Sequence, residues 1–302
     1  MIEPLSPPTL SVIIASTALL RQMPACLLDI LKQCHGRQVE IILVYSSDSD
    51  LQEAIVADDS HVILIRLPPE TALPCLIGTA FARTKGEIIA ITDTTCGVDE
   101  HWIAAILDAH KAPHPIIGGA VEPDKLKRLV DWTAYFCDYG QFMLPLASRT
   151  MQAVPGNNIS IKRWILEKGK EFVEGEFWKT YWCRRIQMEG FSLYAVPSII
   201  VFYRKSFQLW PYLVHRFHNG RCFAGMRLAQ LSQVDRLVYV LGSPFLPILF
   251  CARILKVVLP KRRYLGRFFL AFPLIILATM SWAFGEFVGY LLGSGTSCHR
   301  VR

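Results

Sequence analysis

Two hydrophobic patterns alternate along the first part of the chain. Short apolar stretches rich in β-branched residues, each bounded by polar turn residues, predict strands at 10–15, 39–45, 62–67, 87–92 and 116–121. Between them, apolar residues recur at helical spacing and predict helices at 23–35, 73–84 and 99–110. Apolar strands that alternate with helices are typical of an α/β fold, in which a mostly parallel, Rossmann-type sheet is covered by helices on both faces.

The next part of the chain keeps this alternation less regularly. Helical spacing predicts helices at 126–143, 164–170 and 177–189, a loop with a short strand at 152–161, and a last strand at 193–203. A basic, aromatic helix at 210–231 then has the composition of a helix that lies along a membrane interface.

Two hydrophobic segments close the chain. Residues 268–292 contain one acid, Glu286, and form a stretch long enough to span a bilayer. Residues 237–255 are interrupted by Pro244 and Pro247, and a strongly basic linker follows them. Because basic linkers stay in the cytoplasm, we expect the first segment to be a re-entrant or interfacial hairpin. The expected regions are a ligand-binding domain at 1–205, an interfacial helix region at 206–236 and a membrane anchor of one or two segments at 237–302.

Charge and cysteine content restrict the ligands and the cellular compartment that we expect for this protein. The formal net charge is +7, and basic residues cluster beside apolar segments, which favours contact with anionic lipid or with an anionic ligand such as a diphosphate. No nucleic-acid-binding motif is present, so we expect no nucleic-acid partner. Nine scattered cysteines without zinc-like spacing argue against a disulfide framework and for a reducing compartment. The first nine residues lack the features of a signal peptide, so we expect the N-terminal domain in the cytoplasm.

Ligands of parallel α/β sheets bind beyond the carboxyl ends of the strands. The residues at those positions are Ser16, the turn 46–50 and the segment 93–96. A site that transfers a sugar from a nucleotide diphosphate needs a metal ion or a cluster of basic residues to neutralise the leaving diphosphate. It also needs a carboxylate or imidazole to deprotonate the acceptor hydroxyl.

Several motifs together resemble the family 2 glycosyltransferases, and in particular their membrane-attached bacterial members. The similar segments are Ser11–Ser16, Glu40–Tyr45, Lys85–Asp93, Pro155–Ser160, Arg185–Gly190, Tyr194–Pro197, Phe217–Arg221 and Trp282–Tyr290. Each motif alone is weak, but their order and spacing cover nearly the whole chain. The resemblance implies a GT-A fold at the inner (cytoplasmic) membrane. It also implies inverting transfer of a sugar, such as a hexose, from a nucleotide diphosphate sugar to a lipid-linked or other membrane-associated acceptor of the cell envelope.

The resemblance also implies roles for individual residues. The donor-binding candidates are Ser16, Asp48, Asp50, Asp93, Thr95, His218 and Arg221. Asn157 and Asn158 are the acceptor-binding candidates, and Glu176, with Glu174 as the alternative, is the candidate catalytic base. A divalent metal, Mg²⁺ or Mn²⁺, is expected at Asp93.

The sequence departs from the family pattern at three places. The metal- and ribose-binding Asp-x-Asp is Asp93-Thr94-Thr95 here, without the second carboxylate. Tyr45 and Ser46 occupy the place of an acid that contacts the nucleotide base in the family. Trp178-Lys179 stands where the family has the acidic pair that supplies its catalytic base.

Each candidate also has a structural interpretation, and the alternatives stay open at this point. Asp93 could cap the following helix, and Thr95, Asp48 and Asp50 could simply form turns. Asn157 and Asn158 could shape their loop, and Glu174 and Glu176 could be solvated acids at the start of a helix. His218 and Arg221 could contact lipid headgroups. The missing acids also motivate a second hypothesis, a catalytically silent membrane subunit that binds a nucleotide sugar or a partner enzyme. A nucleotidyltransferase is the third hypothesis. It ranks last because a glycine-rich first loop with Lys or Arg is expected in such an enzyme, and residues 16–21 contain no glycine.

Overall fold

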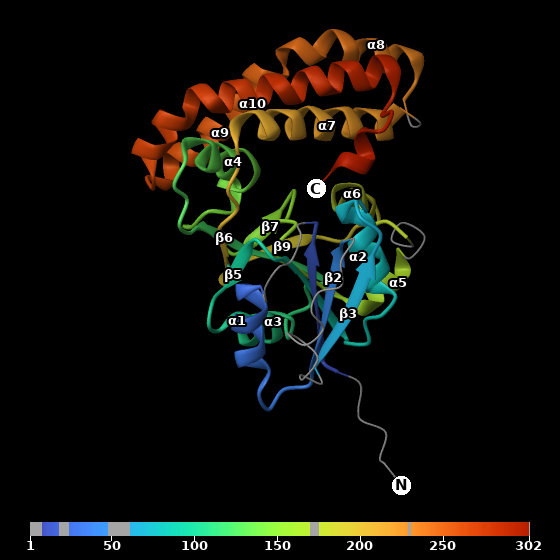
Figure 1. Ribbon diagram of the computed structural model, residues 1–302, viewed down its shortest axis with the longest axis vertical. Coiled ribbons are helices and arrows are strands. Elements are labelled where there is room, and N and C mark those ends of the chain that lie inside the picture. The colour runs from blue at the N-terminus through green and yellow to red at the C-terminus, as the bar shows by residue number, and fades with distance from the viewer. Residues whose placement is uncertain (1–7, 18–23, 48–60, 170–174, 229–230, 302) are drawn as a thin grey trace. The chain divides into compact units, whose positions relative to one another are not determined.

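The structure is a computed structural model that describes residues 8–17, 24–47, 61–169, 175–228 and 231–301 (Figure 1). The chain divides into two compact units, which are described separately. Unit 1 comprises residues 1–122 and 142–204, and unit 2 comprises residues 123–141 and 205–302. Asp48, Asp50 and Glu174, three of the candidate site residues, lie outside the described residues.

The first half of unit 1 is a parallel sheet. Its strands are β1 (Leu10–Ser16), β2 (Val39–Ser46), β3 (Val62–Leu67) and β4 (Ile88–Asp93), and they lie in the order β3-β2-β1-β4. Strands β1, β2 and β4 are almost wholly buried, as their uninterrupted apolar sequences predict. Helix α1 (Ala25–Cys34) follows β1 and helix α2 (Leu73–Phe81) follows β3.

The second half of the sheet pairs antiparallel. Beyond β4 the order continues β8-β6-β9-β5, and β7 pairs with β9. These strands are β5 (Cys96–Val98), β6 (Ile116–Pro123), β7 (Arg149–Met151), β8 (Ile159–Lys162) and β9 (Leu193–Tyr203). The sheet of the described chain thus has nine strands, of which β5 and β7 were not predicted because three residues carry too little pattern.

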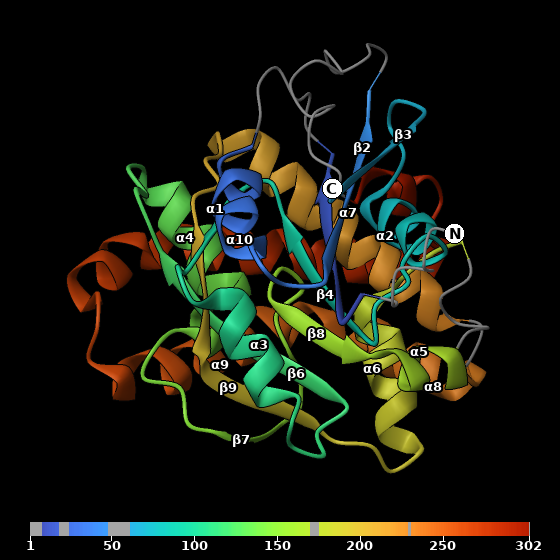
Figure 2. The same cartoon turned by 90° about the horizontal axis from the view of Figure 1, so that it is seen from below.

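Helices cover both faces of this sheet (Figure 2). Helices α1 and α3 (Trp102–Ala109) lie on one face, and α2, α5 (Arg163–Lys168) and α6 (Lys179–Met188) lie on the other. A large apolar cluster joins the second face to its helices and includes Ile13, Ile91, Leu76 and Trp182. The α/β class predicted from the sequence is confirmed.

Unit 2 is helical. It contains α4 (Leu129–Asp138), α7 (Leu209–Leu228), α8 (Gln233–Gly242), α9 (Leu246–Val258) and α10 (Leu265–Leu292), with short 3-10 turns at Gly140–Phe142, Ser243–Phe245, Leu259–Lys261 and Ser297–Arg300. Helices α7 and α10 run side by side (Figure 1). Glycines permit this close approach, because a Cβ on Gly220 would lie 2.2 Å from the carbonyl oxygen of Trp282 and one on Gly285 would lie 2.1 Å from that of Phe217.

Two helical segments of unit 2 are long and apolar enough to cross a membrane. They are Gln233–Lys261, with a mean hydropathy of 1.8, and Leu265–Leu292, with a mean hydropathy of 1.9. The hydrophobic segments predicted at 237–255 and 268–292 lie inside them. Length and composition support membrane association of unit 2.

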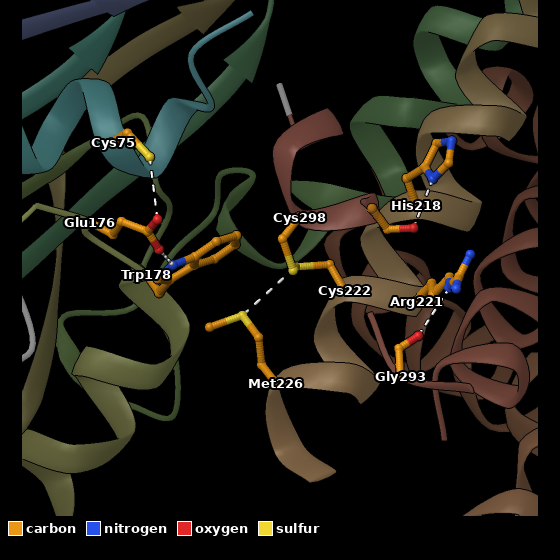
Figure 3. The surroundings of a disulfide bond; sticks show 10 residues. Cys75, Glu176, Trp178, His218, Arg221, Cys222, Met226, Gly293 and Cys298 are labelled. Atoms are coloured by element: carbon orange, nitrogen blue, oxygen red, sulfur yellow. Dashed lines mark hydrogen bonds between the residues drawn. A yellow bond between two sulfur atoms is a disulfide. The ribbon is translucent and has the colours of Figure 1, made fainter. Parts of the chain in front are cut away.

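Unit 2 also contains a disulfide that the sequence did not predict. Cys222 on α7 is bonded to Cys298 in the C-terminal turn, 76 residues away, and Met226 Sδ lies 3.7 Å from the Cys222 sulfur (Figure 3). The other seven cysteines are free. A single bond between distant residues is no disulfide framework, but it fastens the end of the chain to α7.

Candidate functional site

The strand order of unit 1 reverses between β1 and β4. From β1 the chain moves outward to β2 and β3, then returns through α2 to place β4 on the other side of β1. In open α/β sheets ligands bind at such a switch point, beyond the carboxyl ends of the two strands. The residues there are Ser16, at the end of β1, and Asp93, at the end of β4 and paired in register with Ala15.

Hydrogen bonds hold the segment after β4 against β1. Thr94 Oγ1 donates to Ser16 Oγ at 2.9 Å, and Thr94 N donates to the carbonyl oxygen of Ala15 at 3.3 Å. Asp93 Oδ1 accepts from Thr95 N at 2.8 Å and from the Thr95 hydroxyl. The Asp93 carboxylate is half-buried and its orientation is fixed by its own turn. The structure therefore brings Ser16, Asp93 and Thr95 together at the switch point.

Two buried thiols lie close to the Asp93 carboxylate, and no pattern in the sequence singles them out. Burial and then the negative charge of Asp93 raise the pKa of Cys26, at the start of α1, to about 12. Burial and then Asp93 also raise the pKa of Cys96, at the start of β5, well above its ordinary value. Both thiols are therefore protonated at neutral pH, and neither serves as a thiolate ligand or nucleophile.

The described residues do not fit a resident divalent metal at Asp93. No group of three or more His, Cys, Asp or Glu side chains within the described ranges is placed to hold a metal ion. Asp93 supplies one carboxylate, and its thiol neighbours are protonated and soft. Mg²⁺ is commonly held by one or two carboxylates together with substrate phosphates, so a metal at this position needs oxygen ligands from a bound nucleotide.

The two adjacent asparagines at the start of β8 are used differently. Asn158 is buried inside the fold: its Nδ2 donates to the carbonyl oxygens of Ala120 (2.8 Å) and Ile199 (2.9 Å), and its Oδ1 accepts from Trp102 Nε1 (3.0 Å). Every polar group of this side chain is engaged within the protein, which fits a structural role.

Asn157 contacts Cys96, one of the two buried thiols beside Asp93. Its Nδ2 donates to the Cys96 sulfur at 3.1 Å. Its Oδ1 is buried and has no hydrogen-bond partner in the described part of the chain. A buried amide oxygen without a partner costs free energy, so Asn157 is the asparagine with hydrogen-bonding capacity left for a ligand.

Glu176 precedes α6 and lies against the start of α2, the helix that follows the carboxyl end of β3. Phe177 N donates to the carbonyl oxygen of Pro74 at 2.8 Å, and the Glu176 carboxylate accepts from Trp178 Nε1 at 2.6 Å and from the Cys75 thiol at 3.5 Å (Figure 3). Glu176 is exposed. Its carboxylate is oriented by these two donors and remains accessible to solvent.

Lys179 stands where the family resemblance places an acid, and it links two parts of unit 1. Its Nζ donates to the carbonyl oxygen of Val154 at 2.6 Å, immediately before the Pro155-Gly156-Asn157 loop. The departure from the family pattern was visible in the sequence, but its contact with this loop was not. Lys179 thus ties the start of α6 to the loop that carries Asn157.

His218 and Arg221, the donor-binding candidates of unit 2, contact the C-terminal segment of that unit. His218 Nδ1 lies 3.0 Å from Ser297 Oγ, and Arg221 Nε donates to the carbonyl oxygen of Gly293 at 3.0 Å (Figure 3). Burial and then the charges of Arg300 and Arg221 lower the pKa of His218, so its imidazole is neutral at pH 7. The two side chains share one face of α7, as their spacing predicts.

Comparison with known proteins gives a structural likeness and no sequence match. No family model and no curated protein matches the chain. Among solved structures, the chain is similar to the mannosyltransferase PcManGT from Pyrobaculum calidifontis in complex with GDP-Man and Mn²⁺, with a TM-score of 0.59, 16% identity, and coverage of 95% of this chain and 88% of that one. A mycobacterial protein is similar at a TM-score of 0.45 and 12% identity, over 69% of this chain and 72% of that one. The first likeness shows that the chain has the fold of a glycosyltransferase.

Proposed function

We propose that the chain is a glycosyltransferase that moves a sugar from a nucleotide diphosphate sugar to a membrane-associated acceptor, with inversion at the anomeric carbon. The observation that carries this proposal is the switch point between β1 and β4, where Asp93 offers a half-buried, oriented carboxylate beside Ser16. The fold shared with a mannosyltransferase in complex with GDP-Man and Mn²⁺ supports the same donor class.

In the proposed donor site, the nucleotide lies across the carboxyl ends of β1 and β4. Asp93 and Thr95 contact the ribose and diphosphate, and Ser16 contacts the nucleotide. Asp48 and Asp50 remain the proposed contacts of the nucleotide base. Asn157 has an amide oxygen left to accept from an acceptor hydroxyl, while Asn158 acts by fixing the β8 backbone next to it.

The proposed reaction is a single in-line displacement. The acceptor oxygen forms a bond to the anomeric carbon as the bond from that carbon to the diphosphate oxygen breaks, and the acceptor proton passes to a carboxylate. Glu176 is the proposed base, with Glu174 as the alternative. Trp178 Nε1 donates to the Glu176 carboxylate and holds it in place without neutralising it. No step is assigned to a metal, since the described residues do not form a site for one.

The proposal is tested by measuring UDP and GDP release from a panel of donor sugars with the full chain in detergent or lipid. We expect release with at least one donor, a loss of 100-fold or more in Glu176→Gln, and loss of nucleotide binding in Asp93→Asn. Glu189→Gln on the neighbouring α6 is the matched control, because Glu189 contacts Arg185 on its own helix. No release with any donor, together with no nucleotide binding, would contradict the proposal.

A second candidate function is a catalytically silent subunit that binds a nucleotide sugar. Two observations favour it: the described residues contain no group of three or more His, Cys, Asp or Glu side chains that could hold a metal ion, and Lys179 replaces an acid of the family pattern. Calorimetry separates the two functions. Nucleotide binding that is unchanged in Glu176→Ala, without release from any donor, identifies the silent subunit.

A further inference from the structure

The helical hairpin of unit 2, formed by Gln233–Lys261 and α10, exposes two apolar stripes. The side chains that form them are exposed by 38–75%, and from Val234 to Leu249 and from Ile276 to Phe284 they follow helical spacing. On the first helix they are Val234, Leu237, Val238, Leu241, Phe245, Ile248, Leu249 and Leu259; on α10 they are Phe269, Leu270, Ile276, Leu277, Met280, Phe284, Leu291 and Leu292. Stripes of this size on a water-soluble surface mark an interaction site.

The charges of the hairpin favour an anionic lipid surface as the partner. Between residues 253 and 267 the chain has six basic side chains and no acidic one: Arg253, Lys256, Lys261, Arg262, Arg263 and Arg267. These residues lie at the turn of the hairpin and on the end of the helix before it. Apolar stripes flanked by basic residues are typical of helices that lie in the headgroup region of a membrane.

Two helices, α4 and α7, accompany α10 along its length. Near its start, the Phe268 ring lies 5.1 Å from that of Phe136 on α4. From its middle onward α10 contacts α7, where Ser281 Oγ donates to the carbonyl oxygen of Leu213 at 2.7 Å and Gly289 lies against the backbone of Arg221. If α10 crossed a bilayer, α4 and α7 would therefore have to enter the hydrocarbon beside it.

Those two helices carry charges that are unsuited to hydrocarbon. At the middle of α10, the Arg216 guanidinium lies 4.5 Å from the Trp282 ring centroid and donates to Asp138 Oδ1 at 2.6 Å. Helix α7 contains three arginines and two histidines within its 20 residues. Ionisable side chains at membrane depth are costly and rare, so a spanning α10 conflicts with its own neighbours.

We propose that this hairpin lies flat in the surface of an anionic membrane, with its base and its basic turn on the same side, and does not cross the bilayer. The apolar stripes enter the acyl boundary, while α4 and α7 stay on the aqueous side of α10. The two helices, each about 42 Å long at 1.5 Å per residue, then serve as a lipid-contacting surface instead of a transmembrane anchor. The proposal differs from the expectation that 268–292 spans, and it stands or fails independently of the proposed enzymatic function.

The test places single cysteines at the base of the hairpin, at its turn and just beyond the far end of α10. Gln233→Cys lies at the base, Gly266→Cys on the first turn of α10 and Thr296→Cys shortly after α10 ends; all three positions are exposed, with no atom within 4 Å of a Cβ built on Gly266. The full chain is produced in sealed membrane vesicles and treated from either side with a membrane-impermeant maleimide, with the parent chain as the background for native cysteines. We expect all three cysteines to react from the same side, whereas a spanning α10 would place Thr296→Cys on the side opposite to Gly266→Cys. Reaction from opposite sides would overturn the proposal.

A second measurement tests the lipid contact itself. Ile248→Asp places a charge on the stripe, and Met188→Asp is the matched control, because the two side chains are exposed by 71% and 73% and only the first is on the hairpin. With vesicles of phosphatidylglycerol we expect Ile248→Asp to lower the bound fraction tenfold or more and Met188→Asp to leave it unchanged. Equal binding of both variants, or equal binding of the parent chain to neutral phosphatidylcholine vesicles, would contradict the assignment.

Discussion

Replacing Asn158 with alanine is expected to destabilise unit 1 strongly. The substitution removes the three hydrogen bonds that the side chain makes with Trp102 Nε1 and with the carbonyl oxygens of Ala120 and Ile199. A buried polar group left unpaired costs about 1–3 kcal/mol. Because the small cavity admits some relaxation, we expect a loss of roughly 3–5 kcal/mol in the free energy of unfolding. Urea denaturation followed by tryptophan fluorescence measures it.

The neighbouring asparagine supplies the control. Asn157→Ala removes one hydrogen bond to the Cys96 sulfur and removes an amide oxygen that has no partner in the described chain. We therefore expect a change of about 1 kcal/mol or less in the free energy of unfolding, with loss of activity against an acceptor. The interpretation of both residues is refuted if Asn158→Ala costs less than Asn157→Ala.

Three further predictions concern packing, pH and the disulfide. Gly285→Ala drives a Cβ into the Phe217 carbonyl and should lower the stability of unit 2 by about 1–3 kcal/mol, whereas Gly266→Ala has open space and should be neutral or slightly stabilising in thermal unfolding. Burial lowers the pKa of His110 from 6.5 to about 4, so between these pH values the unfolded chain binds a proton that the folded chain does not. The free energy of unfolding therefore falls by up to about 3 kcal/mol as the pH drops from about 6.5 to 4. His110→Gln should reduce this pH dependence in denaturation curves. Reducing Cys222–Cys298, which closes a loop of 76 residues, should lower the unfolding free energy of unit 2 by up to about 4.5 kcal/mol; a melting temperature unaffected by dithiothreitol would contradict this.

Much of unit 1 could be predicted from hydrophobic patterning. The predicted strands 62–67 and 193–203 coincide with β3 and β9, because β-branched and aromatic runs bounded by turn residues carry a strong signal. The predicted helix 99–110 begins later, at Trp102, because Asp99 Oδ1 accepts from His101 N and holds a turn before it. Local pattern gave the elements and left their exact ends to such contacts.

Interactions between distant residues could not be predicted in the same way. Two consecutive asparagines look equivalent in the sequence, yet Asn158 bonds to three other elements and Asn157 faces Cys96. The closeness of Cys26 and Cys96 to Asp93 depends on how α1 and β5 pack at the switch point. A disulfide between residues 222 and 298 likewise leaves no mark in local composition.

The hairpin of unit 2 shows the same limit at a larger scale. Hydropathy identified both segments, but it carries no information on which helices pack against them. In the structure α4 and α7 run beside α10 and place the Arg216–Asp138 ion pair near the middle of α10. Whether a long apolar helix crosses a bilayer depends on what packs against it. The structure supplies that information for α10, and the interfacial position that we propose for it rests on these neighbours.

The most direct test of the central claim is the structure of the full chain crystallised with GDP or UDP and Mn²⁺. We predict that the nucleotide lies beyond the carboxyl ends of β1 and β4, with its ribose and diphosphate against Asp93 and Ser16, and that the metal is held jointly by Asp93 and phosphate oxygens. A nucleotide bound away from this switch point, or none bound at saturating concentration, would contradict the account.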